Sequence, residues 1–152
     1  RPATILELAA HPMIAAVKEA SGDLTQAMAI LADRPEGFAV LSGEDNLTLA
    51  MVACGGDGII SVIGNEAPAA MTALAAAALA GEMDRARELH YRLLPLMDAN
   101  FVETNPAPVK AALALMGRIE NVLRLPLVPV CPASLETVRD ALDRAGLAAE
   151  AS

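Results

Sequence analysis

A parallel α/β fold is predicted for the first 81 residues of this 152-residue chain, followed by a region of helices only. Three apolar runs, at 14–19, 38–42 and 59–63, have the length and aliphatic content of buried strands. Each run is followed by a segment in which apolar residues recur at helical spacing. Strands that alternate with helices in this way form right-handed βα units of a parallel sheet. We therefore expect two domains, 1–81 and 82–152.

The predicted helices of the first domain begin and end at recognisable residues. Ser21 and Asp23 supply capping groups for the helix that follows the first strand. Pro68 suits the first turn of an alanine-rich helix that ends before Gly81. The apolar stripes of the first two helices consist of Leu24, Ala27, Met28 and Leu31, and of Leu47, Ala50, Met51 and Cys54.

Three further helices are predicted in the second domain. The first spans about 84–100 and contains Pro95, which should kink it or remove a backbone hydrogen bond. Asn105 is predicted to cap the second helix, with Pro106 at its first position, and Ser134 to cap the third. The proline-rich stretch between the second and third helices cannot form a central strand.

Composition limits the possible partners and the compartment. The net charge of −8 disfavours nucleic acid, because phosphate contacts require clustered positive charge. The most apolar stretch, 67–80, is too short and too rich in alanine to span a bilayer. Cys54 and Cys131 are isolated, so we expect reduced core residues in a reducing compartment. No secretory signal opens the sequence, and we expect a cytoplasmic protein.

Lys18 is the main candidate for chemistry. It is one of only two lysines and lies in an apolar run that ends at Ser21-Gly22. Apolar surroundings disfavour an ammonium ion, so we expect a lowered pKa and a nucleophilic amine suited to imine formation. A lysine whose stem is buried and whose ammonium reaches water is the alternative. Ser42 to Asp45 and Ser61 to Asn65 fall at the same carboxyl edge of the predicted sheet, where functional groups gather.

The remaining polar residues give weaker signals. Glu44 and Asp45 could act as general acid and base, or could stabilise the positive end of the following helix. The glycine-rich stretch 55–58 precedes a strand rather than following one, so it does not form a phosphate cradle. No metal site is expected, because His11 lies in a loop, His90 lies in a surface-type helical stripe, and neither has ligands at suitable spacing. Lys110 is predicted to be a solvated lysine.

Several segments together resemble the carboxyl-terminal half of the dihydrodipicolinate synthase family. They are 17–23, 41–45, 58–62, 101–110 and 123–129, in the family's order and spacing. The segment that contains the lysine is shared by the wider superfamily of pyruvate-dependent lyases and aldolases. The resemblance implies a partial (β/α)8 TIM barrel, with strands six to eight at 14–19, 38–42 and 59–63, and a carboxyl-terminal helical domain.

The same resemblance implies an activity and a set of site residues. Lys18 matches the Schiff-base lysine that condenses with pyruvate, and the resulting enamine attacks aspartate 4-semialdehyde. Gly43 matches a small residue that lines the pyruvate pocket, and Ile60 matches a position whose main chain meets pyruvate. The resemblance further implies a homotetramer and no metal or organic cofactor, since the lysine itself supplies the electron sink.

Two mild departures, Ser21 and Glu44, stand where the family usually has threonine and aspartate. The family's tyrosine and threonine proton relay and its semialdehyde-binding arginine have no counterpart here, so we expect the isolated chain to be an inactive fragment. Three strands alone would leave two unpaired sheet edges and an uncovered barrel interior, so we also expect poor solubility. Other Schiff-base enzymes, of the sialic acid lyase or 2-keto-3-deoxygluconate aldolase type, are an alternative. A non-catalytic α/β interaction module is another.

Overall fold

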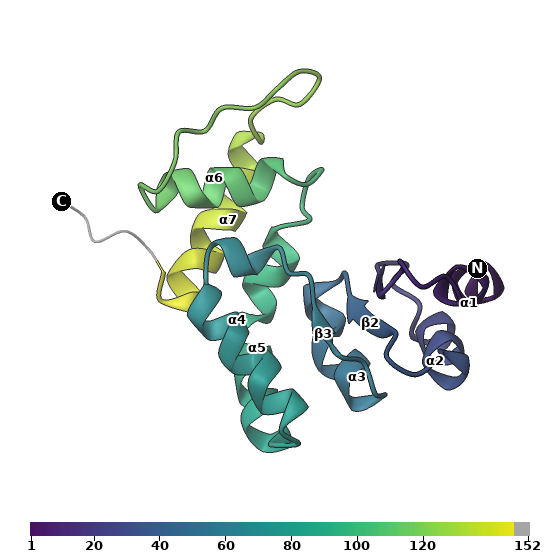
Figure 1. Ribbon diagram of the computed structural model, residues 1–152. Helices are drawn as coiled ribbons and strands as arrows, with labels where there is room; N and C mark the ends of the chain where they lie inside the picture. The colour runs from purple at the N-terminus through teal and green to yellow at the C-terminus, as the bar shows by residue number, and fades with distance from the viewer. Residues whose placement is uncertain (148–152) are drawn as a thin grey trace. The chain divides into compact units, whose positions relative to one another are not determined.

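A computed structural model describes residues 1–147, and within them it contains one sheet of three parallel strands in the order β1-β2-β3 (Figure 1). The strands are β1 (Ala16–Glu19), β2 (Ala39–Ser42) and β3 (Gly58–Ile59). In the register, Lys18 lies opposite Leu41, which in turn lies opposite Gly58. The parallel α/β prediction is confirmed.

The third strand is shorter than predicted. It ends at Ile59, and Ile63–Asn65 form a short 3-10 helix, η2, so the prediction of a strand through residue 63 is wrong. Ile63 is fully buried. The apolar content of this run therefore reflects packing of a turn, which periodicity alone does not distinguish from a strand.

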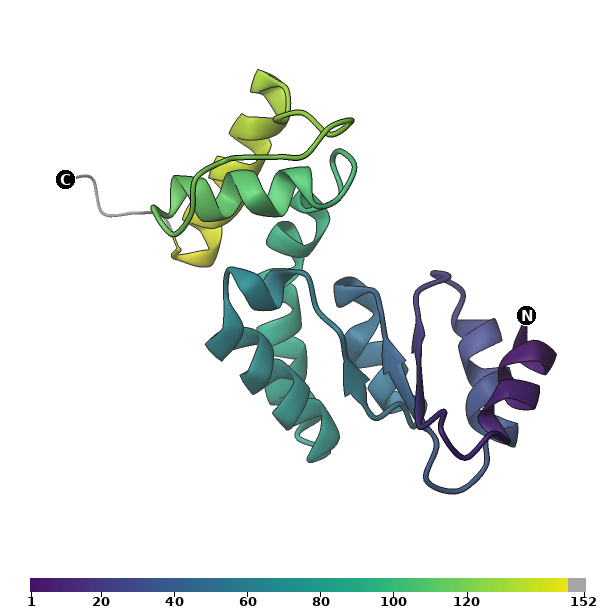
Figure 2. The same cartoon turned by 45° about the horizontal axis from the view of Figure 1, so that its top comes forward.

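Helices follow each strand at nearly the predicted positions. Asp23 caps α2 (Leu24–Asp33), because its carboxylate accepts hydrogen bonds from the N–H groups of Thr25 and Gln26 at 2.8 and 3.3 Å. After β2 the chain forms a 3-10 turn, η1 (Asp45–Leu47), and then α3 (Thr48–Ala53). The chain begins with α1 (Pro2–Ala9), which lies beside α2 in Figures 1 and 2 and contacts it.

Four further helices make up most of the remaining described chain. They are α4 (Pro68–Leu79), α5 (Met83–Ala99), α6 (Ala107–Leu115) and α7 (Pro132–Ala145). α5 spans Pro95, which lies inside the helix predicted over about 84–100, and the kink or lost hydrogen bond at Pro95 stays a prediction. α7 ends at Gly146, whose φ of 72° is left-handed and favours glycine.

Two predicted helix caps are wrong. Pro106 rather than Asn105 is the N-cap of α6, and α7 begins at Pro132, before Ser134. The start of α7 is held by Glu103, whose carboxylate accepts a 2.8 Å hydrogen bond from the N–H of Cys131. The hydroxyl of Ser134 and the Cys131 N–H bind this carboxylate, and together they lower the pKa of Glu103. A cap supplied from 28 positions away cannot be found from local sequence.

The contacts divide the described chain into two compact units, 1–61 with 73–87, and 62–72 with 88–147. The first has a core of Ala9, Ile30, Phe38 and Val40, and the second includes a cluster of Ala107, Ala111 and Val130. The predicted domains, 1–81 and 82–152, were divided where alternating strands and helices give way to helices only, so the contact-based units do not test them and they stay a prediction. Residues 148–152 lie outside the described range.

Both cysteines are free and exposed, so the prediction that they are core residues is wrong. Cys54 directly follows α3 and Cys131 directly precedes α7, so both lie at helix ends. None of the helices within the described range combines the length and hydropathy that a bilayer span requires.

Candidate active site

Lys18 projects from the face of the sheet that lies opposite the hydrophobic core. Its neighbour Val17 packs against the core cluster of Ala9, Ile30, Phe38 and Val40. Successive side chains of a strand point to opposite faces, so Lys18 points away from that cluster. Lys18 is exposed in the structure, so its apolar neighbours along the chain do not provide the desolvation expected from them.

Gly43 lies directly beneath the lysine side chain. It follows β2, and its N–H donates a 2.7 Å hydrogen bond to the carbonyl of Glu19, which continues the pairing of β1 with β2. A Cβ atom at Gly43 would lie 2.4 Å from the Cβ of Ala20 and 2.8 Å from the Cε of Lys18. The absence of a side chain at Gly43 therefore lets the lysine cross the end of β2.

Ile60 completes the group at the same edge. Its N–H donates a 2.9 Å hydrogen bond to the carbonyl of Ser42, so the pairing of β3 with β2 extends one residue beyond Ile59. The register places Ala20, Gly43 and Ile60 in one row, two residues beyond the row of Lys18, Leu41 and Gly58. The sheet thus brings the three predicted site residues, Lys18, Gly43 and Ile60, to one face at its carboxyl end.

The loop after β2 is held by hydroxyl and carboxylate groups. The buried hydroxyl of Ser42 donates to the carbonyl of Glu44 at 2.8 Å and accepts from its N–H at 3.2 Å. Asp45 is only 2% exposed, and its carboxylate accepts a hydrogen bond from the hydroxyl of Ser61. Asp45 also lies in the first turn of η1, where a negative charge is favourable. Its carboxylate is thus engaged in holding the loop.

Comparison with known proteins identifies the family of the chain. The family model described as "Dihydrodipicolinate synthetase family" matches residues 1–145. The chain belongs to this family. A 4-hydroxy-tetrahydrodipicolinate synthase from Koribacter versatilis is 54% identical over 130 residues, which cover 86% of this chain and 43% of the relative.

Solved structures of dihydrodipicolinate synthases have the same fold. The Thermotoga maritima enzyme is 45% identical with a TM-score of 0.93, and the match covers 96% of this chain and 51% of that protein. An Acinetobacter baumannii synthase described as complexed with pyruvate is 38% identical with a TM-score of 0.92, covering 96% of this chain and 50% of that protein. The chain of this dihydrodipicolinate synthetase family member thus spans about half the length of the relatives it matches.

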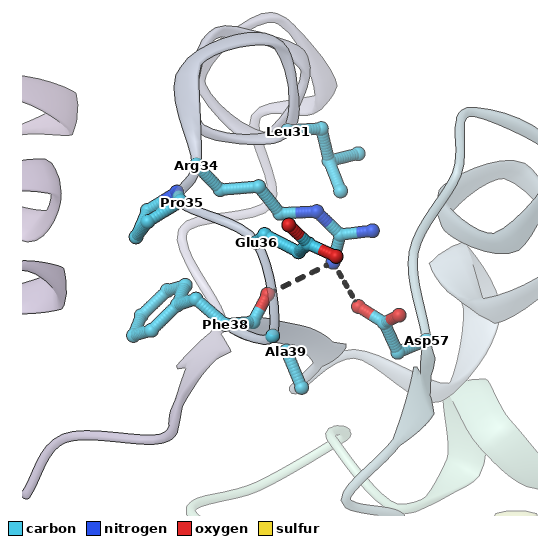
Figure 3. A pocket seen from close by; sticks show the side chains of 8 residues that line it. Leu31, Arg34, Pro35, Glu36, Phe38, Ala39 and Asp57 are labelled. Atoms are coloured by element: carbon cyan, nitrogen blue, oxygen red, sulfur yellow. Dashed lines mark hydrogen bonds and ion pairs between the residues drawn. The ribbon is translucent and has the colours of Figure 1, made fainter. Parts of the chain in front are cut away.

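A second polar cluster in this family member lies at the opposite, amino-terminal end of β2 (Figure 3). The guanidinium of Arg34 donates to the carbonyl of Phe38 at 3.2 Å and pairs with the carboxylate of Asp57, which also accepts a 2.8 Å bond from the N–H of Val40. Burial raises the pKa of Asp57, but the Val40 N–H and the Arg34 guanidinium outweigh it, so that the net pKa is lowered.

Sequence reasoning missed this role of Asp57. It considered the glycine-rich stretch 55–58 only as a phosphate cradle, and the partner Arg34 is 23 positions away. The amino-terminal edge of a parallel sheet is where stabilising rather than catalytic groups are expected. We therefore assign Arg34 and Asp57 to holding the loops before β2 and β3.

Two other interpretations of single residues are corrected. His90 is buried, with 8% of its surface exposed, so the prediction of a surface-type stripe is wrong; burial lowers its pKa, and Asp98 raises it to a lesser extent. The Nζ of Lys110 donates to the carbonyl of Val122, so this lysine is engaged rather than simply solvated. Within residues 1–147 there is no group of three or more histidine, cysteine or acidic side chains placed to hold a metal ion.

Proposed function

We propose that this chain supplies the Schiff-base half of a dihydrodipicolinate synthase, with Lys18 as the nucleophile. The observation that carries the proposal is the convergence of Lys18, Gly43 and Ile60 on one face at the carboxyl end of the sheet, in a chain of this family. Pyruvate and aspartate 4-semialdehyde are the proposed substrates. Gly43 and the main chain of Ile60 border the proposed pyruvate site.

The proposed chemistry is a lysine-catalysed aldol addition. The neutral amine of Lys18 attacks the keto carbon of pyruvate, and loss of water gives an imine. The imine nitrogen accepts electron density when a methyl proton leaves, which gives an enamine. The enamine carbon attacks the aldehyde carbon of aspartate 4-semialdehyde. The amino group of that substrate then displaces Lys18 from the imine carbon, and 4-hydroxy-tetrahydrodipicolinate is released.

The proposed assembly follows from the family. β1, β2 and β3 take the places of strands six to eight in an eight-stranded barrel, whose helical carboxyl-terminal domain corresponds to residues 82–152. In such a barrel the exposed face that carries Lys18 becomes part of the packed interior, which supplies desolvation. We further propose a cytoplasmic homotetramer in lysine and diaminopimelate biosynthesis.

Trapping of the imine tests the proposal. We would build a chimaera in which this chain replaces the matching 51% of the Thermotoga maritima synthase. The chimaera is incubated with pyruvate and borohydride, and the adduct is mapped by mass spectrometry. Lys110→Arg is the matched control, because Lys18 and Lys110 are the only lysines of this chain.

The outcomes separate the candidate functions. An adduct on Lys18 that survives Lys110→Arg and disappears in Lys18→Arg supports the Schiff-base mechanism. No adduct, or an adduct elsewhere in this chain, rejects it and favours a non-catalytic interaction module. A panel of aldehydes offered together with pyruvate, in the absence of borohydride, separates a synthase from sialic acid lyase and 2-keto-3-deoxygluconate aldolase types by the aldehyde that is consumed.

A further inference from the structure

We propose that Asp45 and Ser61 form a clamp that positions the main chain of Ile60 for the keto acid. This inference rests on the proposed function and adds two positioning residues to it. The hydroxyl of Ser61 donates to the carboxylate of Asp45, and Ser61 directly follows Ile60. The clamp therefore connects the loop after β2 to the end of β3.

The end of β3 needs such a contact because the sheet stops there. The ladder between β2 and β3 ends at Ile59, and the N–H of Ile60 makes one further bond to the carbonyl of Ser42. The ladder pairing stops there, and the next regular element begins at Ile63. The bond from Ser61 to Asp45 fixes the backbone directly after Ile60, so that the Ile60 peptide is held on both sides.

Asp45 is itself held firmly enough to act as an anchor. It is 2% exposed, and the residue before it, Glu44, is bound through its main chain by the buried hydroxyl of Ser42. A buried carboxylate that accepts a hydrogen bond from a hydroxyl makes a charge-assisted bond, which is stronger than a neutral one. The same loop contains Gly43, beneath Lys18, so it places both the nucleophile and the Ile60 main chain.

The test uses Ser61→Ala, Ser61→Thr and Asp45→Asn in the chimaera, assayed by borohydride trapping of the imine over a range of pyruvate concentrations. Thr48→Val is the matched control, because the buried Thr48 hydroxyl contacts the carbonyl of Glu44 in the same loop without reaching Ile60. We expect Ser61→Ala to raise the half-saturating pyruvate concentration about tenfold, since misplacement by about 1 Å costs up to about 100-fold.

The maximal trapping rate, which depends on Lys18, should change by less than about twofold. Ser61→Thr should restore binding, because it keeps the hydroxyl, and Asp45→Asn should weaken binding in the same direction even where Ser61→Ala fails to fold. A Thr48→Val variant that weakens pyruvate binding as much as Ser61→Ala would overturn the clamp, as would an unchanged half-saturation in Ser61→Ala. An unsubstituted chimaera that traps no pyruvate would instead overturn the proposed function, and the clamp with it.

Discussion

Substitution of Gly43 by alanine should disable the lysine without removing it. The Cβ atom introduced by Gly43→Ala would lie 2.8 Å from the Cε of Lys18 and 2.4 Å from the Cβ of Ala20. No left-handed φ is involved at this glycine, so the effect is purely steric. The substitution should therefore act by pushing neighbouring atoms away.

The size of the effect follows from the distances. Carbon atoms in contact are normally about 3.5–4.0 Å apart, so the end of the Lys18 side chain must move by about 1 Å. A displacement of about 1 Å at a reacting group can lower a rate about 100-fold. The contact with Ala20 adds a cost in stability of about 1–3 kcal/mol, typical of overpacking, because β1 and β2 are forced apart.

Ala20→Gly separates the two effects. It removes the nearer atom, and by itself should cost about 0.5–1 kcal/mol of stability through backbone entropy. The double variant Ala20→Gly/Gly43→Ala should regain most of the stability lost in Gly43→Ala, because the remaining backbone neighbour of the new Cβ, the carbonyl oxygen of Glu19, lies at 3.1 Å, while its amine remains displaced. We therefore expect the double variant to melt close to Ala20→Gly but to form the imine about 100-fold more slowly.

The assay combines thermal unfolding of the chimaera with the rate of borohydride trapping at saturating pyruvate. If the double variant forms the trapped adduct as fast as the unsubstituted chimaera, the reactivity of Lys18 does not depend on the space next to Gly43. Slow trapping in Ala20→Gly alone would also refute the reasoning, because that substitution leaves the path of Lys18 open.

Two further predictions concern stability and pH. Asp57→Asn should destabilise the fold at neutral pH by removing the charge that pairs with Arg34, and the difference from the unsubstituted protein should vanish as pH falls. The pKa of Asp57 is lowered in the fold, so its contribution to the free energy of unfolding is present above the unfolded pKa and is lost as pH falls through the folded pKa. An equal loss of stability in Asp57→Asn at pH 7 and at pH 2, measured by urea titration, would contradict this. The pKa of His90 is also lowered, here by burial, so the unfolded chain takes up the proton first and stability should decline as pH falls below about 6.5. His90→Gln should flatten this decline between pH 7 and pH 5, and an unchanged slope would show that His90 does not cause it.

The sequence predicted those parts of the fold whose causes lie close together along the chain. The strands β1 and β2 and the helices after them are marked by apolar periodicity and by the cap at Asp23, and the end of α7 is marked by Gly146. The placement of Lys18 and of Ser42 to Asp45 at one edge was also predictable, because parallel strands bring their carboxyl ends together. These inferences require only local pattern and topology, whereas the choice of Gly43 and Ile60 as site residues came from the resemblance to the family.

The features that sequence analysis missed depend on partners far away in the chain. The cap of α7 comes from Glu103, and the charge of Asp57 is balanced by Arg34. His90 was predicted to lie in a surface-type helical stripe, yet it is buried within α5. In each case the sequence supplied the residue type but not the partner that determines its environment.

The position of Lys18 shows how far its own segment can determine its chemistry. The apolar residues beside it in sequence, such as Val17, point to the opposite face and pack in the core, so they cannot desolvate the amine. The Lys18 side chain instead lies next to Gly43, which directly follows β2 and leaves room for it. A nucleophilic amine at this position therefore depends on whatever covers the exposed face of the sheet, and the strand alone only sets its direction. Because of this, a chimaera that closes the barrel should make Lys18 more reactive toward pyruvate than the isolated chain, and equal reactivity in the two would contradict a role for the barrel interior.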